Sequence, residues 1–178
     1  IEKIRVEPSA VIRKFLDAQA NEPLTKYLVK LHEIKQADAE HTKLLLECYI
    51  RDLQTPQLEG GRLGAEQRDG KIKDGQKQIM EEKYKQTNNL LNQFLNQSRP
   101  LAEQSPIQNI AIKTLRRAGY RNRALSQAYK EPQHDKMIIQ IEIEDYPVQD
   151  GNWNFKRALS HLESLRDFEL VIETMEKY

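Results

Sequence analysis

The sequence predicts an all-α fold, an α-solenoid of short antiparallel helical hairpins. Apolar residues recur at helical spacing in successive short segments, separated by proline, glycine or polar links. Only 38% of the 178 residues are apolar and 31% are charged, so each helix should bury one stripe and leave a broad face in water. Hairpins without an exact internal repeat are typical of a degenerate solenoid, in which each unit buries its face against its neighbours. A compact helical bundle is the alternative.

Three short helices are expected in the first third of the chain. Pro8 opens the first, because proline is tolerated at the first helical position, and Pro23 gives the same signal for the second. A polar link at 36–40 leads to the third. The three apolar stripes consist of Val11, Ile12, Phe15 and Leu16; Leu24, Tyr27, Leu28 and Leu31; and Leu44, Leu45, Cys48 and Tyr49.

The middle of the chain departs from this pattern. Residues 54–75 hold five glycines, many charges and few apolar residues, so we expect a flexible Gly-rich loop that buries too little to offset the entropy of ordering. Residues 76–98 are expected to form a longer amphipathic helix, which could be part of an insertion. Its stripe alternates steps of four and three, close to the heptad period of coiled coils, at Met80, Tyr84, Thr87, Leu91 and Phe94.

The hairpins are expected to continue in the last third. Pro106 opens a helix that Gly119 ends, where a left-handed residue is usual, and 121–129 form a short second arm. Asn152 and Asp167 are the expected N-caps of two final helices. The stripes of the three longer helices consist of Ile107, Ile110, Ala111, Leu115 and Ala118; Phe155, Ala158, Leu159 and Leu162; and Phe168, Val171, Ile172 and Met175.

One segment carries a conflicting signal. Alternate positions from Met137 to Ile143 are apolar, which is the period-2 pattern of a strand. However, no second convincing strand exists to pair with it, and Met137, Ile138 and Ile141 also fit one helix face. We therefore predict a helix at 137–143, although the pattern alone leaves both structures open.

Charge and cysteine content limit the classes of function. The formal net charge is +1, with 28 basic and 27 acidic residues, which argues against bulk attraction to nucleic acid or anionic membranes. Cys48 is the only cysteine, so neither an intrachain disulfide nor a cysteine-rich zinc cluster can form, and a reducing, cytosolic setting is expected. No stretch approaches the roughly 20 apolar residues that span a bilayer. Because the chain begins without Met or a signal peptide, we interpret it as a segment of a larger protein.

Catalytic, cofactor and metal sites are not expected. No two of the four histidines lie three or four residues apart, as two ligands on one helix face would, and HExxH does not occur. Cys48 lies on an apolar stripe, where a thiol behaves as a small hydrophobic group. The glycines of EGGRLG follow no strand and lack the GK[ST] ending of a phosphate loop. A helical-bundle enzyme with a metal or carboxylate centre is therefore a weak alternative.

A basic stretch is the first candidate for protein binding. No acidic residue lies between Glu103 and Glu131, a segment that contains Arg116, Arg117, Arg121 and Arg123. It could dock an acidic partner or phospholipid headgroups. The favoured alternative is that the first two arginines complement the dipole of their helix, while the others are solvated or face acidic residues of the next repeat. Those acidic residues are Glu142, Glu144 and Asp145.

The second candidate is the stripe of the long helix. Met80, Tyr84, Leu91 and Phe94 could recruit a helix from another subunit. Such stripes more often pack on neighbouring helices of the same chain, and this alternative is again favoured.

Long runs of the sequence resemble a known family. In chain order they are VEPSAVIRKFLDAQ, LTKYLVKLHE, AEHTKLLLECY, AIKTLRRAGYRNRAL, HDKMIIQIEIED and RALSHLESL. Together they resemble the clathrin heavy-chain repeats of the vacuolar protein sorting-associated protein 11 family. Positions from about 54 to 105 lie outside the resemblance and are interpreted as an insertion.

The resemblance implies a shared core subunit of the HOPS and CORVET tethering complexes of endosomes and of the vacuole or lysosome. It implies a non-enzymatic scaffold without cofactor, acting in vesicle docking, membrane fusion and vacuolar protein transport. The expected location is peripheral, on the cytoplasmic face of late endosomal and vacuolar membranes, with the other subunits as partners. SNAREs and Rab GTPases would be linked only through the complex, and nucleic acid not at all. Coat-like and other trafficking solenoids share the architecture and are the alternative.

Family members also carry a β-propeller and a RING finger outside these repeats. A RING finger needs a set of Cys and His ligands, whereas Cys48 stands alone in this sequence. Any ubiquitin-ligase activity would therefore lie outside this segment.

Overall fold

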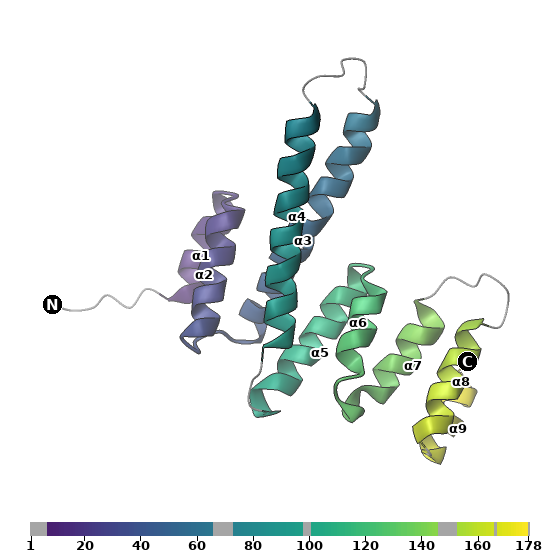
Figure 1. Cartoon of the computed structure of the whole chain (residues 1–178). Coiled ribbons are helices and arrows are strands. Elements are labelled where there is room, and N and C mark those ends of the chain that lie inside the picture. Colours follow the sequence, from purple (N-terminus) through teal and green to yellow (C-terminus); the bar gives the residue numbers. More distant parts are fainter. Residues whose placement is uncertain (1–6, 66–72, 98–100, 146–152, 166, 178) are drawn as a thin grey trace. The chain divides into compact units, whose positions relative to one another are not determined.

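The regular elements of the described residues are all helices, which confirms the predicted all-α class (Figure 1). Within each of two compact units, most helices pack on the next helix in the chain as antiparallel hairpins, the building blocks of an α-solenoid. The two are unit 1 (Ile1–Gln97) and unit 2 (Ser98–Tyr178). A single continuous solenoid over 1–178 stays a prediction. The computed structural model describes residues 7–65, 73–97, 101–145, 153–165 and 167–177.

The first hairpin of unit 1 consists of α1 (Pro8–Asp17) and α2 (Asn21–Glu33). Pro8 opens α1, as predicted. The end of α1 was not predicted: Gln19 has a left-handed φ of 51°, and the N–H of Ala20 donates to the carbonyl of Phe15 at 2.9 Å. This is a Schellman closure, which usually uses glycine. Lys35, with φ 56°, ends α2 in the same way, so both connections are short.

The second hairpin of unit 1 consists of two long helices, α3 (Ala39–Ala65) and α4 (Lys73–Asn96). The prediction of a loop over 54–75 is wrong for 54–65 and 73–75, which are helical; 66–72 lie outside the described residues. Extending an existing helix fixes one residue per hydrogen bond gained, and this outweighs the cost of about 1 kcal/mol for each helical glycine. The predicted helix at 76–98 therefore begins earlier, at Lys73.

The core of unit 1 is built from leucines on three of its helices. Full burial of a leucine side chain contributes roughly 1.5–3 kcal/mol, so these side chains dominate the stability of the unit. The leucines with 0% exposure are Leu24 and Leu28 on α2, Leu45, Leu46 and Leu53 on α3, and Leu91 on α4.

Unit 2 consists of α5 (Leu101–Arg117), α6 (Arg121–Ala128), the short 3-10 helix η1 (Pro132–His134), α7 (Asp135–Glu144), α8 (Trp153–Leu165) and α9 (Phe168–Lys177). Gly119, with φ 81°, follows the end of α5, as predicted. Pro106 does not open α5, because the helix begins at Leu101. Pro106 instead lies inside the helix, where it lacks the N–H that would bond to the carbonyl of Ala102.

The segment at 137–143 is part of α7, so the prediction of a helix is confirmed. Tertiary packing overrides the strand-like alternation, since Ile139 joins Ala158, Leu162 and Leu170 in one core cluster of α7, α8 and α9. Asp167 caps α9 as predicted: its Oδ1 accepts a hydrogen bond from the N–H of Leu170 at 3.1 Å. The other predicted cap, at position 152, lies outside the described residues.

Candidate interaction surfaces

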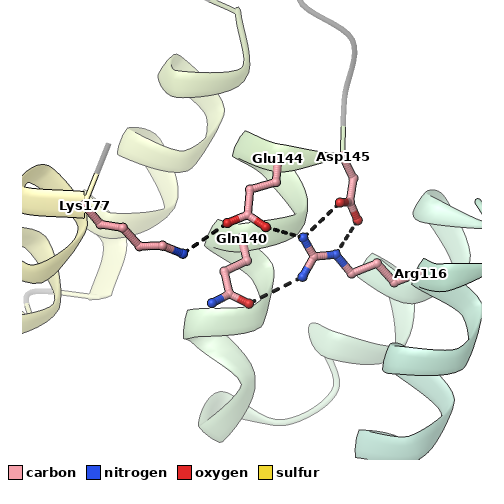
Figure 2. Close-up of polar contacts among 5 residues, drawn as sticks. All are labelled: Arg116, Gln140, Glu144, Asp145 and Lys177. Carbon is pink, nitrogen blue, oxygen red and sulfur yellow. Dashed lines mark hydrogen bonds and ion pairs between the residues drawn. The ribbon is translucent and has the colours of Figure 1, made fainter.

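Arg116 joins α5 to the C-terminal end of α7 (Figure 2). Its guanidinium donates two bonds to the carboxylate of Asp145, at 2.6 and 2.9 Å, and one to Glu144 at 2.6 Å. A longer bond of 3.4 Å reaches the side-chain oxygen of Gln140. The ammonium of Lys177, on α9, donates to the second oxygen of Glu144 at 3.1 Å. This cluster, which we call the Arg116 network, links three helices of unit 2.

The Arg116 network has a clear electrostatic cause. α7 ends on two carboxylates, which lie at the negative end of the helix dipole. Arg116 compensates for them, and its hydrogen bond to Asp145 raises the pKa of the guanidinium. Other arginines of the stretch were expected to be solvated or to face these acidic residues, whereas the structure places Arg116 there. Arg116 therefore serves internal packing.

The remaining arginines of the basic stretch have different surroundings. Arg117 is exposed, whereas Arg121 and Arg123 are half-buried. The guanidinium carbon of Arg123 lies 5.3 Å from the ring centre of Tyr120, within the range of a cation–π contact. The stretch is thus not one uniform basic patch. Protein binding by Arg117, Arg121 and Arg123 stays a prediction.

The stripe of α4 divides into a buried part and a half-buried part. Leu91 is fully buried and Phe94 is 8% exposed. The ring of Phe94 lies 5.0 Å from that of His32 on α2 and 6.5 Å from that of Tyr49 on α3. This half of the stripe packs on its own chain, the alternative that the sequence analysis favoured. Leu91 and Phe94 are consequently not available to another subunit.

The other half of α4 keeps apolar surface. Met80 and Tyr84 are half-buried. Leu90 is 49% exposed and Ile79 is 68% exposed, so the most exposed apolar side chain of this helix was not among the predicted contacts. Ile79 lies beside the heptad stripe rather than on it, and for this reason the periodicity did not identify it.

A groove between α1 and α3 was also missed. It has a volume of about 420 Å³ and is lined by apolar residues between charged ones. Leu16 is 46% exposed, although it belongs to the predicted stripe of α1. The periodicity could not identify the exposure of Leu16, because each of the three stripes in the first third has four apolar residues.

Unit 2 also buries a carboxylate between α7 and α8. Glu142 is 2% exposed, and one of its oxygens lies 3.2 Å from the guanidinium of Arg157. Burial raises the pKa of Glu142, while Arg157 and His161 lower it. The arrangement is an ion pair with one exposed member rather than a cleft with two facing acids.

The described residues contain no group of three or more His, Cys, Asp or Glu side chains placed to hold a metal ion. Cys48 is 2% exposed, and burial raises the pKa of its thiol. Among the helices described, none combines the length and apolar character that crossing a bilayer requires.

Comparison with known proteins gives the family. The family model described as "PEP5/VPS11 Clathrin repeat" matches residues 2–60. Homologues of vacuolar protein sorting-associated protein 11 from Homo sapiens and Dictyostelium discoideum are each 32% identical over 174 residues, which is 98% of this chain. The chain belongs to the vacuolar protein sorting-associated protein 11 family. The Arabidopsis thaliana homologue is 32% identical over 173 residues, or 97% of the chain.

The family match extends through both units. Because the relatives align over nearly the whole chain, the matched range includes the α3–α4 hairpin. The chain spans 14% of the length of these family members. No solved structure matches the chain significantly.

Proposed function

We propose that the chain is a non-enzymatic scaffold segment of a membrane-tethering complex, acting in vesicle docking and fusion and in vacuolar protein transport. The observation that carries the proposal is the 32% identity over 98% of the chain to proteins whose name states vacuolar protein sorting. Hairpins that leave long helix faces in water support it, because such faces suit protein–protein contacts.

The proposed site of action is the cytoplasmic face of late endosomal and vacuolar or lysosomal membranes. The segment would be held there through the rest of the complex. Its partners would be the other subunits of HOPS and CORVET, and SNAREs and Rab GTPases would be linked through them.

The α3–α4 hairpin is the proposed contact for one such subunit. Its helices have 27 and 24 residues, against 10 and 13 in the first hairpin, and they extend past α1 and α2 (Figure 1). The N-terminal half of α4 carries Ile79 together with Met80 and Tyr84 of the predicted stripe. A partner helix could cover these residues with its own apolar face.

A pulldown against the purified subunits tests the proposal. The variant replaces residues 59–84 by a four-residue Gly/Ser linker, which shortens both helices and retains Leu91 and Phe94. We expect the intact chain to capture a subunit and the shortened chain to lose that capture. Ile79→Asp should weaken it, whereas Ile172→Asp, at a similarly exposed position in unit 2, should not.

The outcomes separate the two parts of the proposal. Equal capture by both chains would keep the scaffold function and move the contact away from α3–α4. If neither chain captures a subunit while both are helical by circular dichroism, the scaffold function is wrong.

A coat-like subunit is the second candidate, because the matching family model is described as a clathrin repeat. A coat subunit would self-assemble into large lattices. Sedimentation velocity of the chain at increasing concentration distinguishes the two: large assemblies favour the coat, and a constant small species favours the tethering scaffold.

A further inference from the structure

The first turn of α5 is followed by a proline, which the interior of a helix disfavours. Pro106 has no N–H to donate to the carbonyl of Ala102, and its ring crowds that carbonyl. Proline also disfavours the helical conformation of the residue before it, yet Ser105 is helical. Residues 101–104 are therefore attached to the rest of α5 less firmly than a turn of an uninterrupted helix.

The same segment carries the sequence signal of a second helix start. Residues 105–108, SPIQ, have the S-x-x-Q pattern of a capping box, in which Ser105 is the N-cap. Pro106 then occupies the first helical position, where an N–H has no helical partner in any case. In such a box the serine hydroxyl accepts a hydrogen bond from the N–H of Gln108, and the side-chain oxygen of Gln108 accepts one from the N–H of Ser105.

The observed structure does not use this capping box. Gln108 is 4% exposed, and its side-chain oxygen is buried without a hydrogen-bond partner among the described residues. Few buried polar atoms of folded proteins lack a partner. The hydroxyl of Ser105 accepts a hydrogen bond from the side chain of Gln133 in η1, which also donates to Glu131. Gln133 thus ties Ser105 to η1 while α5 begins at its observed first turn.

We propose that α5 exchanges between two starts, the observed one and a capped one at Pro106. Unwinding of 101–104 removes the helical partners of the N–H groups of Ser105, Ile107 and Gln108. The capping box returns partners to Ser105 and Gln108, so that only Ile107 loses its hydrogen bond. The backbone entropy gained by 101–104 and the relief of the strain at Pro106 favour the capped start.

The exchange makes the entry of the chain into unit 2 extensible. An extended residue spans about 3.3 Å and a helical one about 1.5 Å, so unwinding of 101–104 lengthens the path that leads to Pro106 by about 7 Å. The inference does not depend on the scaffold function, because it concerns an equilibrium within the chain itself.

Amide hydrogen exchange of the intact chain, followed by NMR, tests the proposal. Asn109 donates to the carbonyl of Ser105 in both states, whereas Ile107 is bonded only in the observed one. We expect the protection factor of Ile107 to be at least about tenfold below that of Asn109. Pro106→Ala restores the missing N–H and should raise the protection of Ile107 at least about fivefold. Pro8→Ala, at the start of α1, is the control and should change neither amide.

Two further variants separate capping from a purely structural contact of Ser105. Gln133→Ala releases the hydroxyl of Ser105 and should lower the protection of Ile107 further. Adding Ser105→Ala to Gln133→Ala then removes only the cap, so the protection should rise again by about fivefold, the typical effect of an N-cap serine. A serine that acts only as a structural contact would not restore protection when it is removed.

Equal protection of Ile107 and Asn109 in the intact chain overturns the proposal, and so does unchanged protection of Ile107 in Pro106→Ala. If the double variant stays as weakly protected as Gln133→Ala, Ser105 is not a cap and the second start is wrong. Pro106 is exposed, so Pro106→Ala removes no core contact. The fluorescence of Trp153 in urea checks that unit 2 of each variant is folded.

Discussion

Individual charged residues in unit 2 act mainly on each other. Arg116 and Lys177 share the carboxylate of Glu144, and Arg116 also holds Asp145. The side chains of Arg116 and Asp145 are 25% and 16% exposed, so water screens their attraction less than it screens a surface pair. From the sequence, Arg116 was expected to complement the dipole of its own helix, and other arginines were expected to be solvated or to face these acids; the structure instead pairs Arg116 with Glu144 and Asp145.

Arg116→Ala should destabilise unit 2 by about 1–2 kcal/mol, because it leaves the carboxylates at the end of α7 uncompensated. Arg117 is the next residue and is exposed, so Arg117→Ala should change stability by less than about 0.5 kcal/mol. The only tryptophan, Trp153, belongs to unit 2, so its fluorescence in urea measures both variants. Similar midpoints for the two variants would contradict a stabilising role of the Arg116 network.

The burial of Glu142 predicts how the stability of the folded chain depends on pH. The sign of this dependence is opposite to that of an ordinary ion-paired carboxylate. Burial raises the pKa of Glu142 in the folded chain above the ordinary value of 4.5, so folding favours the protonated form. This contribution is fully present below that ordinary value and is lost as the pH rises through the raised pKa. Glu142→Gln removes the titration.

The stability of Glu142→Gln relative to the intact chain should therefore increase as the pH rises from the ordinary value of 4.5 through the raised pKa. Urea titrations followed by Trp153 fluorescence at several pH values measure this difference. Other carboxylates titrate in both chains and cancel in the comparison. A difference that stays constant or decreases with pH would show that Glu142 does not carry the predicted penalty.

At the scale of elements, helix ends were harder to predict than helix faces. Pro8, Gly119 and Asp167 mark ends by chemistry that the sequence shows. Gln19 and Lys35 close helices in a conformation that glycine usually adopts, and their residue type gives no such signal. The packing that follows α1 and α2 selects these turns.

α4 is fixed in unit 1 by Phe94, whose ring contacts α2 and α3. Phe94→Ala should destabilise unit 1 by about 3 kcal/mol, because it removes a buried ring and leaves a cavity. Leu90→Ala, on the same helix at 49% exposure, should cost less than about 1 kcal/mol. The buried thiol of Cys48 reports the opening of unit 1 through its labelling rate in urea. Equal effects of the two variants would mean that Phe94 does not anchor α4.

At the scale of the whole molecule, the helices divide into two compact units with their own cores. The core of unit 1 is the leucine set of α2, α3 and α4, and a core of unit 2 is the cluster of α7, α8 and α9. Each unit contains one natural probe of unfolding: the thiol of Cys48 in unit 1 and the fluorescence of Trp153 in unit 2.

We therefore expect each destabilising substitution to affect only its own unit. Phe94→Ala should shift the urea midpoint of Cys48 labelling and leave that of Trp153 fluorescence unchanged. Arg116→Ala should do the reverse. Coincident shifts of both probes would show that the units unfold as a single cooperative structure.

The sequence by itself determined the all-α class, the faces that most helices bury and the family resemblance, because these depend on periodicity and on long matching runs. Only the tertiary structure decided that 54–65 continue α3, that 137–143 is a helix and that Arg116 pairs with α7. In each case the local signals were balanced. At 54–65 the glycines oppose the propagation of a helix, and at 137–143 the period-2 pattern of a strand competes with the pattern of a helix face. In the basic stretch, several arginines were available to pair with the same acidic residues. At 54–65 the propagation of an existing helix settles the balance. At 137–143 and at Arg116, contacts between segments distant in sequence settle it, since burial and ion pairing outweigh propensities of about 1 kcal/mol or less.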